Sequence, residues 1–365
     1  MIRSEDKITT SQAIVVLVSY IMAAGILTLP RTAAEEAGTP DVWISVLLGG
    51  LVTMAAGVVM TKLSQDYPGQ TFFQYGEDIV GKWLSIVISL LFIEHFVAIA
   101  AFEARIMAEV ITFFLLQQTP IWAIVMSTMW VGFYSIKDGM GSLARLFEII
   151  FPITILFFLT VVFMSFGIFE LDNLRPVLGE GIMPALKGTK ATMISFISAE
   201  VMMFLLAFMK KPKNGVKVVV MGIGIAMLFY LTTVVFVIGG LSVEGVTATT
   251  WPTLNLIRSF EMPGLIFERF ESLLLVIWIM QLFATFSVSF YAASLGLSQI
   301  FKKKSRPIMF GLLPVMYLLA MTPKNIDNVF SLGDMVGYQA AVLFGIVPIP
   351  LLLISKMRKK KPLQS

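Results

Sequence analysis

The chain has 365 residues, of which 57% are hydrophobic and only 14% are charged. A soluble globular protein carries about 25% charged residues, so this composition excludes a soluble protein and indicates a membrane protein with several spans. The net charge is +4, and the absence of cysteine together with a single histidine excludes disulfides, Cys-ligated metals and a multi-histidine metal site.

Ten apolar segments follow one another along the chain. A bilayer core about 30 Å thick needs about 20 helical residues for one crossing, and the continuous apolar runs favour helices over a β-barrel. We therefore predict an all-α polytopic membrane protein, with residues 1–365 forming one transmembrane domain. The expected spans are residues 11–36, 42–65, 82–118, 120–136, 145–168, 188–209, 215–241, 266–300, 307–322 and 335–355.

Basic residues alternate between the two sides of these spans. With the N-terminus inside, most of the 27 Lys and Arg residues fall in inside connections, including clusters at 210–217, 302–306 and 356–361. Cytoplasmic connections carry such an excess, so we predict that both termini are cytoplasmic. The outer connection at 242–265 has an apolar pattern suited to a helix that lies on the outer face and covers an opening.

The first span is interrupted near its middle. Gly25 permits unusual dihedral angles and Pro30 removes an N–H, so we expect a break over the four residues from Gly25 and a second half-helix starting near Leu29. Amides at the start of that half-helix would favour an anionic group such as a carboxylate. A plain proline kink is the alternative. The candidate ligand-binding residues here are Gly25, Ile26, Leu27 and Thr28.

The sixth span could carry a matching break. Ten spans divide into two halves of opposite orientation, about 10–168 and 188–356, and in transporters built this way a discontinuous first helix in each half forms the substrate site. The stretch "MISFISAEVMM" has no Gly or Pro, but it places serines and a carboxylate at mid-depth. The candidate ligand-binding residues here are Ser195, Ser198, Ala199 and Glu200.

Three stretches carry a family resemblance: "GILTLPRTAAEEAGTPDVWISVLLGG", "YPGQTFFQYGEDIVGKW" and "WPTLNLIRSFEMPGLIFERFESLLLVIWI". Together they resemble the B subunit of endospore germinant receptors, the spore permease branch of the amino acid–polyamine–organocation superfamily. The "PGLIFERFE" stretch is the most specific. The resemblance implies a LeuT-like fold with discontinuous helices 1 and 6, and a small germinant, often an amino acid, bound at mid-membrane. It also implies partnership with an A subunit and a C lipoprotein in the spore inner membrane.

The resemblance further implies that spans 3 and 8 line the pocket. Near the middle of span 3, Val97 and Ala101 form an i, i+4 pair, and in span 8 Ser287 and Tyr291 form another. Tyr291 offers a ring and a hydroxyl, and Ser287 a hydroxyl. Helix packing on small residues explains the first pair equally well, and a bond to its own helix explains Ser287.

Ionisable residues inside a membrane are costly and are candidates for function. We expect Arg105 and Glu109, four residues apart, to form a structural pair near the outer boundary. Glu94 and His95 lie deeper, where titration or a solvated vestibule would explain them, and Glu200 is the stronger functional candidate. The ionisable residues of span 3 are Glu94, His95, Glu103, Arg105 and Glu109.

The sequence leaves two functions open. No nucleophile–base pair, metal-ligand set or phosphate-binding loop stands out, so we expect neither catalysis nor a cofactor. A nutrient-sensing receptor subunit and an amino-acid transporter with coupled uptake would use the same pocket, and the resemblance favours the receptor. A scaffold with an unused pocket is a weaker third hypothesis, because Gly25 leaves room for a ligand. A sugar or nucleoside would also fit a mostly apolar lining.

Overall fold

A computed structural model describes residues 6–196, 198–259 and 270–359. Nearly all of this part of the chain is helical, with one isolated β-bridge between Ile8 and Met209. The helices are α1 (Thr10–Ile21), α2 (Gly25–Ala37), α3 (Val42–Gln65), α4 (Phe72–Val80), α5 (Lys82–Phe114), α6 (Ile121–Ile136), α7 (Met140–Ser165), η2 (Leu171–Leu174), α8 (Met183–Phe196), η3 (Ala199–Val201), α9 (Met202–Phe208), η4 (Pro212–Asn214), α10 (Gly215–Thr247), α11 (Pro252–Arg258), α12 (Phe270–Ile300), α13 (Ser305–Met321), α14 (Ile326–Ala340), the π-helical η5 (Ala341–Ile346) and α15 (Pro348–Lys359).

The described helices follow the apolar runs of the sequence. Seven of the helical segments are long and apolar enough to cross a membrane, and eight if α1 and α2 count as one bent span. Two more apolar helices, α6 and α13, are shorter. The all-helical membrane architecture is therefore confirmed. The count of ten spans and the repeat boundaries at 10–168 and 188–356 stay predictions.

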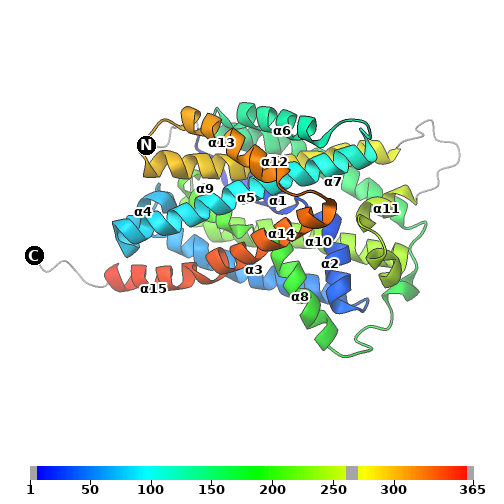
Figure 1. Cartoon of the computed structure of the whole chain (residues 1–365). Coiled ribbons are helices and arrows are strands. Elements are labelled where there is room, and N and C mark those ends of the chain that lie inside the picture. Colours follow the sequence, from blue (N-terminus) through cyan, green and yellow to red (C-terminus); the bar gives the residue numbers. More distant parts are fainter. Residues whose placement is uncertain (1–5, 197, 260–269, 360–365) are drawn as a thin grey trace, which may run out of the picture.

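The helices form an elongated bundle in which α5 runs through the middle (Figure 1). α5 packs along α12, and on the other side of the molecule α3 packs against α8 and α10. α11 lies at the opposite end of the bundle from α4 and from the end of α15 (Figure 1). The break between α1 and α2 and the break between α8 and α9 lie in the interior of the bundle, because Met22, Ala24 and Ser198 are all buried.

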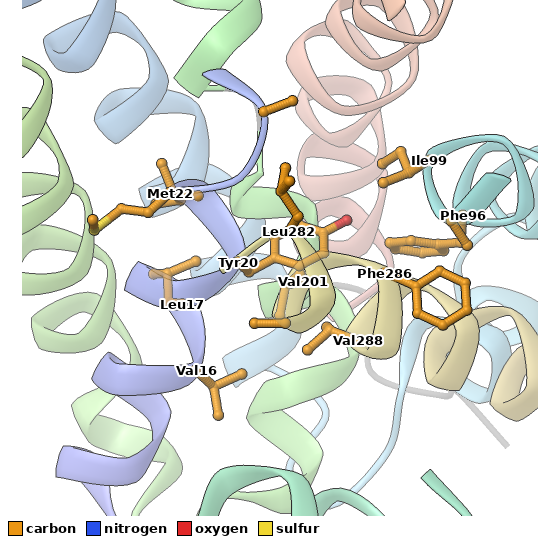
Figure 2. Packing of buried hydrophobic residues seen from close by; sticks show 14 of the residues in the cluster. Val16, Leu17, Tyr20, Met22, Phe96, Ile99, Val201, Leu282, Phe286 and Val288 are labelled. Atoms are coloured by element: carbon orange, nitrogen blue, oxygen red, sulfur yellow. The ribbon is translucent and has the colours of Figure 1, made fainter. Parts of the chain in front are cut away.

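Buried hydrophobic side chains from α1, η3, α5 and α12 meet next to the first break. Figure 2 shows Tyr20 projecting from the last turn of α1 beside Leu282 and Val201 and toward Ile99. Tyr20, Val201 and Leu282 are each at most 1% exposed. A polar hydroxyl is thus held inside an apolar cluster, where it needs a hydrogen-bond partner.

The connections between the spans differ from the sequence expectation or refine it in several places. α11 is the helix expected in the outer connection, whereas α4 was not predicted. α10 continues past residue 241, with a kink at Ser242, where φ is 60°. The "PGLIFERFE" stretch covers residues 263–271, so most of it lies outside the described residues.

Candidate functional site

The first span breaks between α1 and α2, at residues 22–24, where the two helices are bent by 52°. Gly25 is the first residue of α2, so the predicted start of the second half-helix near Leu29 was wrong by one turn. Pro30 lies inside α2 and does not begin it. The break is set instead by side chains of other helices, which take over the hydrogen bonds that a continuous helix would make.

At the break, the donor and the acceptor of one lost helical hydrogen bond each have a new partner. In a continuous helix the N–H of Ala24 would bond the carbonyl of Tyr20. Here that N–H donates to the carboxylate of Glu103 from α5. Thr285 of α12 donates its hydroxyl to the Tyr20 carbonyl at 2.8 Å. A carboxyl group does lie at the start of α2, but it belongs to the protein.

Tyr230 of α10 replaces the next helical bond. Its hydroxyl donates to the carbonyl of Ile21 at 2.6 Å and lies 3.5 Å from the carbonyl of Ser195 in α8. A Cβ atom on Gly25 would lie 2.6 Å from this hydroxyl. Glycine is therefore required at position 25 for the close approach of Tyr230.

Pro30 leaves a further carbonyl of α2 without its helical donor, and α11 supplies a donor to it. Because proline has no N–H, the carbonyl of Ile26 lacks its helical donor. Thr253, in the first turn of α11, donates its hydroxyl to this carbonyl at 2.9 Å. Both residues are buried, so the bond anchors α11 on α2.

The sixth span is interrupted as well. α8 ends at Phe196, Ser198 has φ −164° and ψ 2°, and the chain resumes as η3 and α9. The hydroxyl of Tyr20 donates to Glu200 of η3 at 3.1 Å and accepts from Ser289 of α12 at 3.2 Å. Tyr20 therefore connects the two breaks. The prediction that helices 1 and 6 are both discontinuous is confirmed.

A cavity of about 480 Å³ lies against both breaks. Tyr20, Ala24 and Gly25 line it at the first break, and Ser195 and Ser198 line it at the second. The wall continues along α2 and α14 to charged side chains. A cavity of this size can hold a small organic molecule.

Some of the predicted ligand-binding residues line this cavity and others do not. Gly25, Thr28, Ser195 and Ser198 do. Glu200 is connected to the cavity through Tyr20. Ile26, Leu27 and Ala199 are buried and are not part of the wall.

The predicted residues of α5 and α12 lie on other faces of those helices. α5 presents Ile99 to the cavity. Val97 and Ala101 are each two residues away from Ile99, and two residues of an α-helix correspond to a rotation of about 200° around its axis, so both point away from the cavity. α12 presents Thr285, and the same offset turns Ser287 away, where its hydroxyl lies 3.4 Å from that of Ser135.

Tyr291 is also placed away from the cavity wall. Its ring packs edge-on against Phe208 of α9, with 6.0 Å between the ring centroids. Like Ser287, it therefore contributes to helix packing in this structure.

Other ionisable side chains of α5 hydrogen-bond neighbouring groups. Arg105 binds Glu109 at 2.8 Å and donates to the carbonyl of Ala320 at 3.0 Å, which confirms the expected structural pair. Deeper in α5, Glu94 and His95 both hydrogen-bond Gln339 of α14. Across the described ranges, no group of three or more His, Asp or Glu side chains is arranged to hold a metal ion.

The sequence alone did not single out Glu103, Thr285, Tyr230 or Thr253. Glu103 was visible as an ionisable residue inside a span, which is itself a signal of function. Thr285, Tyr230 and Thr253 are common polar residues, and only the fold shows that each faces a backbone carbonyl freed by a break or by proline.

The fold and the site define a membrane protein of the LeuT-like class, in which two discontinuous helices flank a central cavity. Two solved structures share this architecture. MhsT in complex with L-phenylalanine superposes with a TM-score of 0.69 at 12% identity, covering 95% of this chain and 97% of that one. MHP1, a nucleobase-cation-symport-1 family transporter, gives 0.70 at 13% identity, covering 98% and 80%.

The chain belongs to the spore permease family, described as spore germination proteins, whose model matches residues 7–329. It is 59% identical over 360 residues to spore germination protein YndE of Bacillus subtilis (strain 168), covering 99% of both chains. It is 36% identical to spore germination protein A2 over 97% of both chains. It is 34% identical to spore germination protein B2, over 99% of this chain and 98% of that one, also from Bacillus subtilis (strain 168). The protein is therefore a multi-pass membrane protein of the spore permease type.

Proposed function

We propose that this chain is the nutrient-sensing membrane subunit of a spore germinant receptor. In this proposal it binds a small germinant of the amino-acid class in the cavity and signals to partner subunits. The observation that carries the proposal is the cavity of about 480 Å³ that touches both broken spans. A ligand there contacts α2 and α8 next to the break in each span, so it can favour one arrangement of the two spans over another.

The relatives and one solved structure of the same fold support this proposal. Three relatives are named spore germination proteins, and the MhsT structure holds L-phenylalanine within the same fold. The partners in the proposal are an A subunit and a C lipoprotein. The location is the spore inner membrane, with both termini cytoplasmic.

A bulky residue in the cavity wall tests the proposal. Ser195→Phe would place a ring where a ligand contacts α8, so spores carrying it should need at least about tenfold more amino acid to germinate. Ser127→Phe is the matched control, because Ser127 is exposed on the outer face of α6. Germination of spores is followed by optical density over a panel of L-amino acids, with chain abundance measured by immunoblot. An unchanged dose response at normal abundance would contradict the proposal.

A coupled amino-acid transporter is the second candidate function. It is favoured by the shared fold with MHP1, which is named a transporter. The two functions use the same cavity and differ in whether the ligand crosses the membrane.

A further inference from the structure

The first break contains a carboxylate with one unused oxygen. Glu103 is only 4% exposed and lines the cavity. One of its oxygens accepts the N–H of Ala24. Its Oε2 atom is buried and has no hydrogen-bond partner among the described residues. Buried carboxylate oxygens are normally hydrogen-bonded or paired with a cation, so this oxygen lacks a donor.

Three donors of the protein next to Glu103 are already used. The hydroxyls of Thr285 and Tyr230 donate to the carbonyls of Tyr20 and Ile21. The N–H of Ala24, which an incoming carboxylate would otherwise take, is bonded to Glu103. At this point the break offers an acceptor to a ligand, and a ligand anion placed against the N–H of Ala24 would meet the carboxyl group of Glu103.

The wall as a whole is rich in acidic side chains. Arg31 is bound to Glu35 at 2.7 Å, and the Lys190 ammonium lies over the Tyr338 ring, 5.2 Å from its centroid. A concave surface with an excess of one charge concentrates ligands of the opposite charge. The acidic residues of the wall are Glu35, Glu36, Glu103, Asp327 and Asp334, and the basic ones are Arg31 and Lys190.

We propose that Glu103 binds the amino group of the ligand. A protonated amine brings a positive charge and up to three donors, one of which bonds Oε2, so the buried carboxylate gains both the hydrogen bond and the counter-charge that it lacks. The inference rests on the proposed function, because it takes the ligand to enter this cavity. It narrows the ligand to amino acids and other amines, and it excludes neutral sugars and carboxylic acids without an amine.

Sets of compounds that differ only in their amino group test this on the unaltered protein. The full-length chain in lipid nanodiscs is titrated by calorimetry with L-amino acids, with the matching carboxylic acids that lack the amine, with the matching amines that lack the carboxylate, and with D-glucose. We expect binding only by compounds that carry an amine. This comparison needs no variant, so it does not depend on how any substitution folds.

Glu103→Gln then tests the residue itself. The amide oxygen of glutamine can still accept the N–H of Ala24, but the negative charge is lost. Amine binding should become about 10- to 100-fold weaker, the range for a lost charge-assisted hydrogen bond. Glu77→Gln removes a charge from an exposed position of α4 and should leave binding unchanged.

Three results would overturn the inference, and they separate it from the proposed function. If glucose, or carboxylic acids that lack an amine, bind the wild type and Glu103→Gln with equal affinity, only the inference is wrong. If Glu103→Gln abolishes stabilisation by Na⁺ or K⁺ but leaves amino-acid affinity unchanged, the oxygen holds an inorganic cation. If the wild type binds none of the probes, the proposed function fails together with the inference.

Discussion

Tyr230 serves both broken spans with one hydroxyl. It donates to the carbonyl of Ile21 at the end of α1 and lies against the carbonyl of Ser195 near the end of α8. Carbonyls at a helix end need such a donor when no water reaches them. The hydroxyl can reach this position only because Gly25 has no Cβ atom, since that atom would lie 2.6 Å away.

This contact predicts a non-additive pair of substitutions. Gly25→Ala should lower the stability of the protein by about 1–3 kcal/mol, because the new methyl group must displace the Tyr230 hydroxyl from Ile21. Tyr230→Phe alone should cost a similar amount, because it leaves that carbonyl without a donor. In the double variant the methyl group meets no hydroxyl, so the combined cost should be smaller than the sum by about 1 kcal/mol.

The measurement is thermal unfolding of the purified chain in nanodiscs for the wild type and the three variants. Gly224→Ala is the control for the helix propensity of alanine, because no atom lies within 4 Å of the Cβ position at Gly224. Strictly additive costs would show that Gly25 and Tyr230 do not interact.

The residues of the first break show what the sequence could and could not reveal. Gly25 and Pro30 placed a break to within one turn, because both residues weaken a helix by local geometry. Its position at residues 22–24 depends on Glu103, Thr285 and Tyr230, which lie far along the chain. Local sequence rules contain no information on such partners.

At the scale of whole elements, α11 is held on α2 by one buried hydrogen bond. Thr253 donates to the Ile26 carbonyl that Pro30 leaves open. α2 also lines the cavity, so α11 and a bound ligand contact the same half-helix. The position of α11 can therefore respond to movement of α2.

Thr253→Val should loosen this contact. Valine keeps the shape but removes the donor, which leaves a buried carbonyl unbonded at a cost of about 1–3 kcal/mol. We expect a lower melting temperature and faster proteolysis near α11 in the purified chain. Thr247→Val is the matched control, since the hydroxyl of Thr247 bonds carbonyls of its own helix. Equal effects of the two substitutions would argue against an anchor at Thr253.

Hydrophobic runs predicted the elements well but not the faces that they present. Nine of the ten apolar runs begin and end within six residues of the described helices, because a bilayer demands continuous apolar length, whereas the run at 335–355 starts nine residues after the beginning of α14. α5 and α12 are apolar nearly all round, so their sequences contain no clear stripe that marks the cavity side. Val97 and Ser287 were therefore assigned to the wall, whereas the structure presents Ile99 and Thr285.

At the scale of the molecule, the two broken spans are tied at the breaks and also at the start of α1. The N–H of Ile8 donates to the carbonyl of Phe208, and the N–H of Lys210 donates to the carbonyl of Ile8, both at 2.8 Å. The ammonium of Lys7 donates to the carbonyl of Ala207 at 2.9 Å. The chain before α1 is thus bound to the end of α9.

These ties bear on the choice between a receptor and a transporter. Under the predicted orientation they lie on the cytoplasmic side. A transporter must separate its broken spans there in every cycle to release its ligand inward. A receptor needs only a ligand that binds one arrangement better than another, and a shift from 1:99 to 99:1 requires about 5.5 kcal/mol of differential affinity.

The final prediction follows from that difference. In vesicles that contain only this chain, a radiolabelled amino acid that binds it should be neither concentrated nor exchanged. The reason is that the hydrogen bonds between the two broken spans stay in place when the ligand binds. Uptake and counterflow are measured with the wild type, and Ser195→Phe serves as a control with a blocked cavity. Saturable counterflow that Ser195→Phe removes would reject the receptor and establish transport. The receptor would be supported if the chain binds the amino acid without counterflow and if germination requires the partner subunits. Ligand binding would then act by changing the conformation of the chain within the membrane.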